Sequence, residues 1–258
     1  MACKITKTIT TMFSLLIVIS MVVVFNPNNA SAEQQLSPEQ KQEVQSIVRE
    51  YLLQNPGVIV DSIRELRRRD EAAAAESRKN ALGSLQDKLE KDSNDPFIGN
   101  PDGDITIVEF FDYRCGYCKK VFPDVQKLLK EDGNIKFVLK EWPILGDDSV
   151  YASKAALSVW FGQTAKYNDF HGAMMENKGS LSNDRVIEIA AEQGIDVEKM
   201  KVGFADPRVE MVIANNTELA GNLNVTGTPA FVFGKDLMPG AIDYETMKQL
   251  VDGMRAKN

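Results

Sequence analysis

The feature that most constrains this chain is a pair of cysteines, Cys115 and Cys118, placed where an apolar run gives way to a helical pattern. The run from Ile105 to Phe111 is apolar except for Thr106 and Glu109, which is typical of a strand buried on both faces. A cysteine in the first turn of a helix faces unpaired backbone N–H groups and the positive end of the helix dipole, and both stabilise a thiolate. The second cysteine, in the same turn, can attack a mixed disulfide formed by the first. The spacing therefore predicts a redox pair with Cys115 as the attacking sulfur and Cys118 as the buried, resolving sulfur.

The first residues of the chain indicate export. Lys4 and Lys7 precede an uncharged run from Thr8 to Phe25, and Ala30-Ser31-Ala32 supplies the small residues of a cleavage site. We expect residues 1–32 to be a cleaved signal peptide and the mature protein to lie in the periplasm of a bacterial cell envelope. The alternative is an uncleaved membrane anchor, because the apolar run is nearly long enough to span a bilayer.

Loss of this leader changes the charge and the cysteine content. Residues 1–32 carry two lysines and no acid, so the mature chain has 28 basic and 37 acidic residues and a net charge of −9. A nucleic-acid partner is not expected at that charge. Cys3 leaves with the leader, so Cys115 and Cys118 are the only cysteines that remain. An exported chain with one such pair uses it for exchange chemistry rather than as a structural framework.

An N-terminal helical arm is expected over residues 33–92. Ser37-Pro38-Glu39-Gln40 combines an N-cap, a proline at the first helical position and a glutamine at the third, which is a helix start signal. Asn55-Pro56-Gly57 interrupts the pattern, and a second helix follows from Val60 to Leu89. The arm has one apolar stripe and too few apolar residues for a core of its own. We expect it to form a homo-oligomer; the alternatives are that it folds back on the main domain or is a mobile linker.

The main domain is expected over residues 96–258, after turn-rich segments that mark its boundary. Two strands joined by a helix predict a βαβ unit with the cysteines at its first βα turn. Residues from about 148 to 223 read as an inserted helical subdomain. The other expected elements are a strand from Ile105 to Phe111, a helix from Cys118 to Lys130, a strand from Asn134 to Trp142, a late strand from Ala230 to Gly234 and a closing helix from Tyr244 to Arg255.

The segment from Phe110 to Cys118, followed by a helical insertion and then by Gly227-Thr228-Pro229-Ala230, resembles the DsbA-like branch of the thioredoxin superfamily. The segment from Lys140 to Gly146 and the arm in front make it more similar to the Com1 and ScsC (suppressor of copper sensitivity) proteins. The resemblance covers residues 96–258 and extends to the arm in kind only. It implies an α/β thioredoxin fold with an inserted helical subdomain.

The same resemblance implies roles for individual residues. Cys115 and Cys118 are the catalytic pair, and Gly116 and Tyr117 lie between them as supporting residues. DsbA has a histidine at the position of Tyr117, so its strongly oxidising behaviour does not carry over, because a tyrosine offers no positive charge to the thiolate.

Two further regions are implied. Pro229 corresponds to a cis-proline beside the disulfide, and Thr228 would present its backbone to an extended substrate; an ordinary trans proline is the alternative. Glu109 corresponds to a buried acid that relays a proton to or from the resolving cysteine, with a pKa raised by burial. An edge-exposed carboxylate, or a partner for Lys140 on the neighbouring strand, is the alternative for Glu109.

No metal or cofactor is expected besides the Cys115–Cys118 disulfide, because the mature chain offers one histidine, His171, and no third cysteine for a closed site. His171 is expected to be structural. We predict an exported thiol-disulfide oxidoreductase that forms, isomerises or reduces disulfides, in a direction the sequence leaves open. Its expected partners are unfolded or misfolded envelope proteins and a membrane redox partner that recycles the dithiol. A metal site between subunits, built from pairs of cysteines, stays open. Two alternative functions also remain: a copper-protective protein that binds Cu(I) with its reduced cysteines, and a non-enzymatic oligomeric holdase.

Overall fold

The structure is a computed structural model that describes residues 36–256. The expected signal peptide, its cleavage site and Cys3 lie outside the described residues. Contacts divide the chain into two compact units, Met1–Ile63 and Arg64–Asn258. They are called the first and the second unit below, and each is described by itself.

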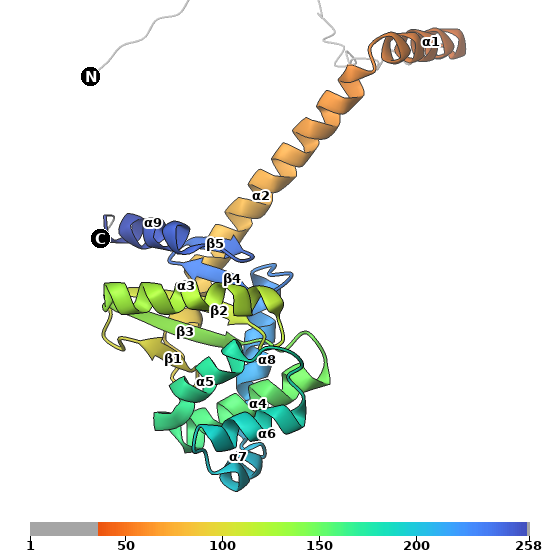
Figure 1. Cartoon of the computed structure of the whole chain (residues 1–258). Helices are drawn as coiled ribbons and strands as arrows, with labels where there is room; N and C mark the ends of the chain where they lie inside the picture. Colours follow the sequence, from red (N-terminus) through yellow and green to blue (C-terminus); the bar gives the residue numbers. More distant parts are fainter. Residues whose placement is uncertain (1–35, 257–258) are drawn as a thin grey trace, which may run out of the picture. The chain divides into compact units, whose positions relative to one another are not determined.

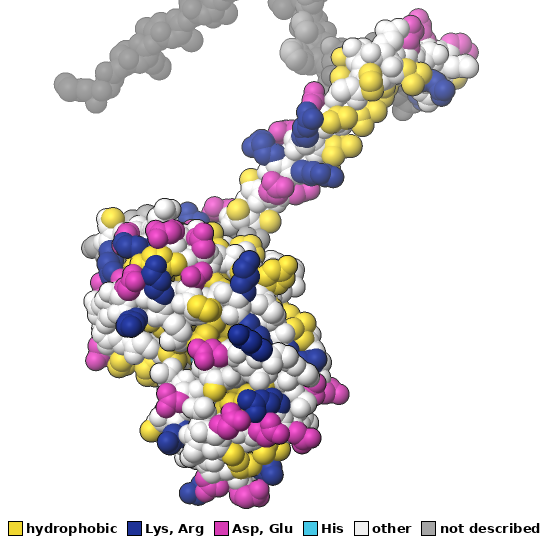
Figure 2. Space-filling view, viewed as in Figure 1, with side chains coloured by type: hydrophobic (Ala, Val, Ile, Leu, Met, Phe, Trp, Pro, Cys, Tyr) yellow, Lys and Arg dark blue, Asp and Glu magenta, His cyan; other side chains and the backbone are white. Residues whose placement is uncertain are grey.

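The first unit contains helix α1 (Pro38–Gln54) and the start of helix α2 (Gly57–Glu90). The Ser37 hydroxyl accepts a hydrogen bond from the Gln40 N–H, and the Gln40 side chain accepts one from the Ser37 N–H, so α1 starts with a reciprocal capping box. No residue of α1 is buried. Figure 2 shows apolar side chains along this unit; those of one stripe are between 46% and 59% exposed: Val44, Ile47, Val48 and Tyr51. Within the described part of this unit, the stripe is not covered.

The second unit is built on a five-stranded sheet of order β1-β3-β2-β4-β5. Strands β2 and β3 are parallel and joined by α3 (Gly116–Asp132), while the other neighbours are antiparallel. This is the expected βαβ unit. The strands are β1 (Phe97–Gly99), β2 (Ile105–Phe111), β3 (Ile135–Glu141), β4 (Ala230–Phe233) and β5 (Asp236–Pro239).

Helices cover both faces of this sheet. Helices α3 and α9 (Tyr244–Arg255) pack on the face that carries Ile107 and Phe111 of β2. Helix α8 (Pro207–Asn222) and the last turns of α2 pack on the opposite face, against Val108 and Phe110. Because side chains alternate along a strand, residues one position apart in β2 or β3 belong to different faces.

Between β3 and β4 lies the helical insertion, drawn green to blue below the sheet in Figure 1. Its elements are α4 (Asp147–Gly162), η1 (Thr164–Lys166), α5 (Tyr167–Glu176), α6 (Asn183–Glu192), α7 (Val197–Gly203) and α8. The predicted fold class, a thioredoxin fold with an inserted helical subdomain and a helical region in front, is confirmed. Across residues 36–256, no helix combines the length and the apolar character that a membrane span requires.

The end of α2 differs from the expected arm. Leu82 and Leu89 are buried against the sheet, so contacts divide the chain before Arg64 rather than at the turns around residues 92–96. Two lysines of β3 hold the terminal carbonyls of this helix: Lys136 Nζ donates to the Glu90 carbonyl at 3.0 Å, and Lys140 Nζ to the Lys88 carbonyl at 2.8 Å. These bonds satisfy groups that the helix itself leaves unpaired.

Candidate functional site

The cysteines lie where β2 passes into α3, and a buried aspartate shapes this turn. Cys115 is the N-cap residue of α3 and its N–H donates to the Asp112 carbonyl at 3.0 Å. The Asp112 carboxylate accepts four hydrogen bonds, from the N–H groups of Arg114 (2.7 Å), Ile144 (2.8 Å) and Leu145 (3.0 Å) and from the Ser149 hydroxyl (2.9 Å). It therefore joins the turn before Cys115 to the loop between β3 and α4. No periodic pattern predicts this role, because three of the four partners lie more than thirty positions away in the sequence.

The two sulfurs differ in exposure and in acidity. Cys115 is 7% exposed and Cys118 is fully buried, and neither forms a disulfide. The Cys118 thiol donates a hydrogen bond to the Cys115 sulfur, and this bond, with smaller contributions from Thr228 and from the backbone N–H groups of Cys118 and Tyr117, lowers the pKa of Cys115 to about 5. Burial, followed by that same hydrogen bond, raises the pKa of Cys118 above its ordinary value. At neutral pH the pair therefore consists of a Cys115 thiolate and a Cys118 thiol.

The loop before β4 forms the other wall of the site. The Thr228–Pro229 peptide bond is cis, and Ala230, the next residue, pairs with Phe110 of β2. As a thiol, Cys115 reaches the Thr228 carbonyl with its Sγ at 3.2 Å. This loop lines a groove of about 390 Å³ that continues to the end of β5. Thr228 and Pro229 thus lie beside Cys115, and their role in binding substrate stays a prediction.

Glu109 lies on the same sheet face as α3. It is in register with Leu139 of β3 and Phe231 of β4, both in the core beneath that helix. Its side chain is 4% exposed, and no described residue gives its Oε1 a hydrogen-bond partner. Burial, and then the negative charge of Cys115, raise the pKa of Glu109 to about 8. A carboxyl group with this pKa can hold a proton at neutral pH and exchange it with a nearby thiol.

Neither alternative for Glu109 agrees with the structure. The strand is central and the carboxyl is buried, so an edge-exposed carboxylate is wrong. Lys140 follows Leu139 and therefore faces the opposite side of the sheet, where it pairs with the buried Asp95. Asp95 has a pKa raised to about 6, because its burial outweighs the charge of Lys140. The relay role of Glu109 stays a prediction.

Gly116 and Tyr117, the residues between the cysteines, make little side-chain contact with the two sulfurs. The Tyr117 side chain is 67% exposed, so its contribution to the thiolate comes from its backbone N–H rather than from its ring. A Cβ atom added at Gly116 would meet open space, so no crowding demands glycine there.

A buried polar cluster behind the site was not predicted. The Tyr113 hydroxyl lies 3.1 Å from Glu141 Oε1 and 2.9 Å from His171 Nδ1, and the Ser153 hydroxyl donates to Glu141 Oε2 at 2.7 Å. Burial raises the pKa of Glu141 and lowers that of His171 to about 3, so His171 is uncharged at neutral pH. His171 therefore contributes to a hydrogen-bonded link between the turn of Tyr113 and helix α5. In residues 36–256, no group of three or more histidine, cysteine, aspartate or glutamate side chains could hold a metal ion.

Comparison with known proteins relates both parts of the chain to described families. The DSBA-like thioredoxin domain matches residues 106–252, and the copper resistance protein ScsC N-terminal domain matches residues 40–73. Disulfide bond formation protein D of Bacillus subtilis is 25% identical over 167 residues, which cover 61% of this chain and 75% of the relative. A Na(+)/H(+) antiporter, NhaA 1 of Salinispora arenicola, is 27% identical over 154 residues, 59% of this chain, and the chain spans 24% of its length.

Two solved structures are similar over most of their length. A thioredoxin-like oxidoreductase from Silicibacter pomeroyi is 41% identical, with a TM-score of 0.64 over 66% of this chain and 97% of that one. A Proteus mirabilis ScsC variant with a linker deletion is 30% identical, with a TM-score of 0.67 over 88% of this chain and 100% of that one.

Proposed function

The chain belongs to the DsbA-like thioredoxin family and is a thiol-disulfide oxidoreductase, and we propose that Cys115 and Cys118 carry this activity in the periplasm. The observation that supports these roles is the asymmetry of the pair: the sulfur nearer the surface has a lowered pKa, and the buried sulfur has a raised one. The leader pattern of residues 1–32 supports export.

In the reducing direction, the Cys115 thiolate attacks one sulfur of a substrate disulfide. The substrate disulfide breaks, a Cys115–substrate disulfide forms, and one substrate thiolate leaves. Cys118 then loses its proton and attacks the Cys115 sulfur, which releases the second substrate thiolate and leaves the Cys115–Cys118 disulfide. The substrate has gained two electrons and the protein has lost two. The reverse sequence oxidises a substrate dithiol.

Glu109 is positioned to take part in the second step. Its negative charge is one of the causes that raise the pKa of Cys118, so the two groups interact, and its own carboxyl has no competing partner among the described residues. When Cys118 attacks, its proton needs an acceptor. We assign that acceptance to the ionised form of Glu109, which becomes easier to reach once Cys115 is in a mixed disulfide and no longer carries the negative charge that helps to raise the Glu109 pKa.

The experiment combines two measurements on the mature protein. The equilibrium potential of the pair in glutathione buffers sets the direction, since about 30 mV corresponds to about 1.4 kcal/mol for a two-electron couple. A denatured secreted protein with scrambled disulfides then tests whether the reduced form isomerises them. We expect Cys115→Ser to lose all activity and Cys118→Ser to accumulate mixed disulfides. Full activity in Cys115→Ser would contradict the assignment and favour the holdase alternative.

We further propose that the first unit joins copies of this chain, so that several cysteine pairs serve one unfolded or misfolded envelope protein. The support is the uncovered apolar stripe of α1. Sedimentation velocity of the mature chain tests this. Ile47→Glu places a charge in the stripe and is expected to lower the association state. Ser46→Glu adds the same charge on the other side of the helix and is expected to leave it unchanged. Equal association states of the two variants would contradict the proposal.

We also propose that a membrane protein recycles the dithiol. Cys118→Ser, which cannot resolve a mixed disulfide, is expected to trap this partner on Cys115.

A further inference from the structure

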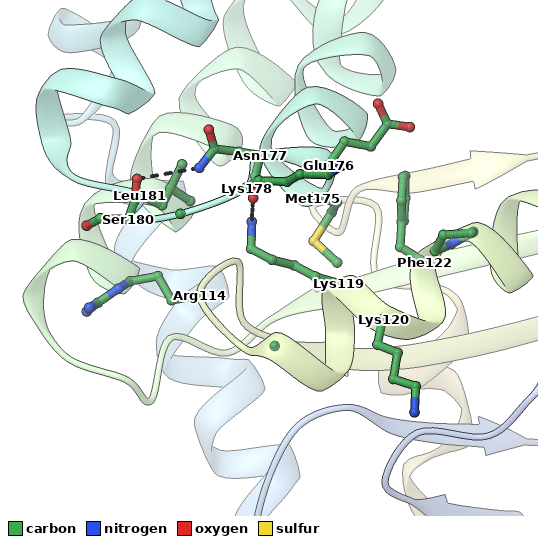
Figure 3. Close-up of a pocket in the computed structure, with 13 residues that line it drawn as sticks. Arg114, Lys119, Lys120, Phe122, Met175, Glu176, Asn177, Lys178, Ser180 and Leu181 are labelled. Carbon is green, nitrogen blue, oxygen red and sulfur yellow. Dashed lines mark hydrogen bonds between the residues drawn. The ribbon is translucent and has the colours of Figure 1, made fainter.

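A basic pocket lies at the first turns of α3, where the cysteine pair is placed (Figure 3). It has a volume of about 910 Å³. The residues on either side of Cys115 in the chain, Arg114 and Gly116, line it, together with the first turns of α3 and the segment from Met175 to Leu181. Its base is apolar: Phe122, Met175 and Leu181 are all buried.

The charge of this pocket is opposite to that of the whole chain. Four cationic side chains line it, Arg114, Lys119, Lys120 and Lys178, and one carboxylate, that of Glu176, opposes them. The chain as a whole carries a net charge of −7. Lys120 and Lys178 are exposed, and neither forms an ion pair with any residue between 36 and 256. A local excess of positive charge on an acidic protein attracts a negatively charged ligand.

Lys119 is the best-defined cation of the pocket. Its Nζ donates to the Met174 carbonyl at 2.7 Å and to the Asn177 carbonyl at 3.0 Å, and Figure 3 shows the side chain directed at that loop. The side chain is partly buried, and burial lowers its pKa. Its hydrogen-bond partners in the described part of the chain are neutral carbonyls, so its charge has no carboxylate within ion-pair distance. The two bonds fix the pocket wall, and the third N–H of the ammonium group is left for a ligand.

Arg114 connects the pocket to the reacting sulfur. It precedes Cys115, and its Nη1 donates to the Leu145 carbonyl at 2.8 Å and lies 3.7 Å from Asp148 Oδ2. These two contacts hold the guanidinium beside the loop from Ile144 to Leu145 and leave several of its five N–H groups without a partner among the described residues.

The pocket and the groove at Thr228 have no residue in common, yet each is lined by a neighbour of Cys115: Arg114 and Gly116 adjoin it in the chain, and the Thr228 carbonyl lies 3.2 Å from its Sγ. A polypeptide whose cysteine has reacted with Cys115 is therefore held at a sulfur close to both. An extended chain advances about 3.3 Å per residue, so side chains a few positions from the reacting cysteine come within reach of the pocket.

We propose that this pocket binds an aspartate or glutamate side chain of the substrate polypeptide a few residues from its reacting cysteine. The inference rests on the proposed function, since it assigns a substrate preference to the same cysteine pair. It makes cysteines in acidic sequence contexts the preferred substrates.

The test uses synthetic peptides with one cysteine, held as a mixed disulfide with 2-thiopyridine. The peptides are identical except that a glutamate, a glutamine or a lysine stands two, three or four positions before or after the cysteine. The Cys115 thiolate attacks the peptide sulfur, the bond to thiopyridine breaks, and the released thiopyridine is followed by its absorbance. Rates are compared for the reduced full-length mature protein at low and at high salt.

We expect the glutamate peptide of at least one position to react about twofold to fivefold faster than its lysine counterpart at low salt, the range of one partly exposed ion pair, and the difference to shrink at high salt. Lys178→Glu is expected to reduce or reverse this preference. Lys235→Glu, on the turn between β4 and β5, makes the same change of charge outside the pocket and is expected to retain it.

Equal rates for all three side chains at every position would overturn the inference while leaving the proposed function intact. Equal loss of preference in both variants would also overturn it, because the effect would then come from overall charge. Failure of every peptide to react would instead contradict the proposed function.

Discussion

The raised pKa of Glu109 makes the stability of the reduced protein depend on pH in a way that one substitution can isolate. Glu109→Gln replaces the carboxyl with a neutral group of the same shape. In the unfolded chain the glutamate ionises near its ordinary value of 4.5, while in the folded protein it stays protonated up to about pH 8. Between these values the folded state binds more protons than the unfolded state, so this group makes the free energy of unfolding fall as the pH rises.

The size of the effect follows from the shift. Each pH unit between the two pKa values changes the free energy of unfolding by about 1.4 kcal/mol, so Glu109 contributes a loss of about 3 kcal/mol between pH 5 and pH 7.5. The glutamine variant lacks this loss. Relative to the wild type, we therefore expect its free energy of unfolding to increase by about 3 kcal/mol over that range, while contributions from groups that do not interact with Glu109 cancel in the comparison.

Urea unfolding of both proteins under reducing conditions, at pH 5, 6, 7 and 7.5, measures this difference. Glu218→Gln, which neutralises an exposed carboxylate of α8, is the matched control and is expected to give a curve parallel to the wild type. Parallel curves for Glu109→Gln and the wild type would refute the reasoning, because they would mean that Glu109 ionises alike in both states.

Three further outcomes are expected. Alkylation of the reduced protein by iodoacetamide should modify Cys115 alone at pH 7, with a rate that rises through about pH 5 and is flat above pH 6, as measured by mass spectrometry; a rise centred near pH 8 would contradict the lowered pKa. Lys140→Met leaves Asp95 buried without its cation and should lower the free energy of unfolding by about 3–5 kcal/mol, whereas a double variant with Asp95→Leu should regain much of this; no recovery would show that the two residues do not act as a pair. Tyr113→Phe removes the shared partner of Glu141 and His171 and should cost about 1–3 kcal/mol in urea unfolding, and an unchanged midpoint would mean that the cluster is not stabilising.

The sequence was informative where a local pattern decides the structure. The apolar run from Ile105 to Phe111, the cysteine spacing and the capping residues of α1 each determine an element from its own residues, and these elements occur at the expected places. The helical insertion was predicted for the same reason.

Features that depend on the pairing of distant segments were not predictable. Whether Lys140 faces Glu109 is decided by the register of β2 against β3, since a shift of one residue exchanges the faces of a strand. The distant partners of Asp112, Tyr113 and Lys119 come from the end of β3, from the insertion or from the loop between them, and no spacing within one segment predicts these contacts. The leucines near residues 82–89 have the same periodicity as the rest of the arm, so the pattern alone did not reveal that the sheet covers them.

The pairing of a barely exposed Cys115 thiolate with a fully buried Cys118 thiol also determines which product forms when a peroxide oxidises Cys115. Hydrogen peroxide oxidises a thiolate to a sulfenic acid, and in the absence of a second thiol a further equivalent makes a sulfinic acid that ordinary reductants do not reverse. Here the oxidised Cys115 would have the Cys118 sulfur as its hydrogen-bonded neighbour, and condensation of the two expels water and closes the same disulfide that exchange produces. Oxidation of Cys115 by peroxide thus ends in the Cys115–Cys118 disulfide, which the normal redox cycle can reduce again.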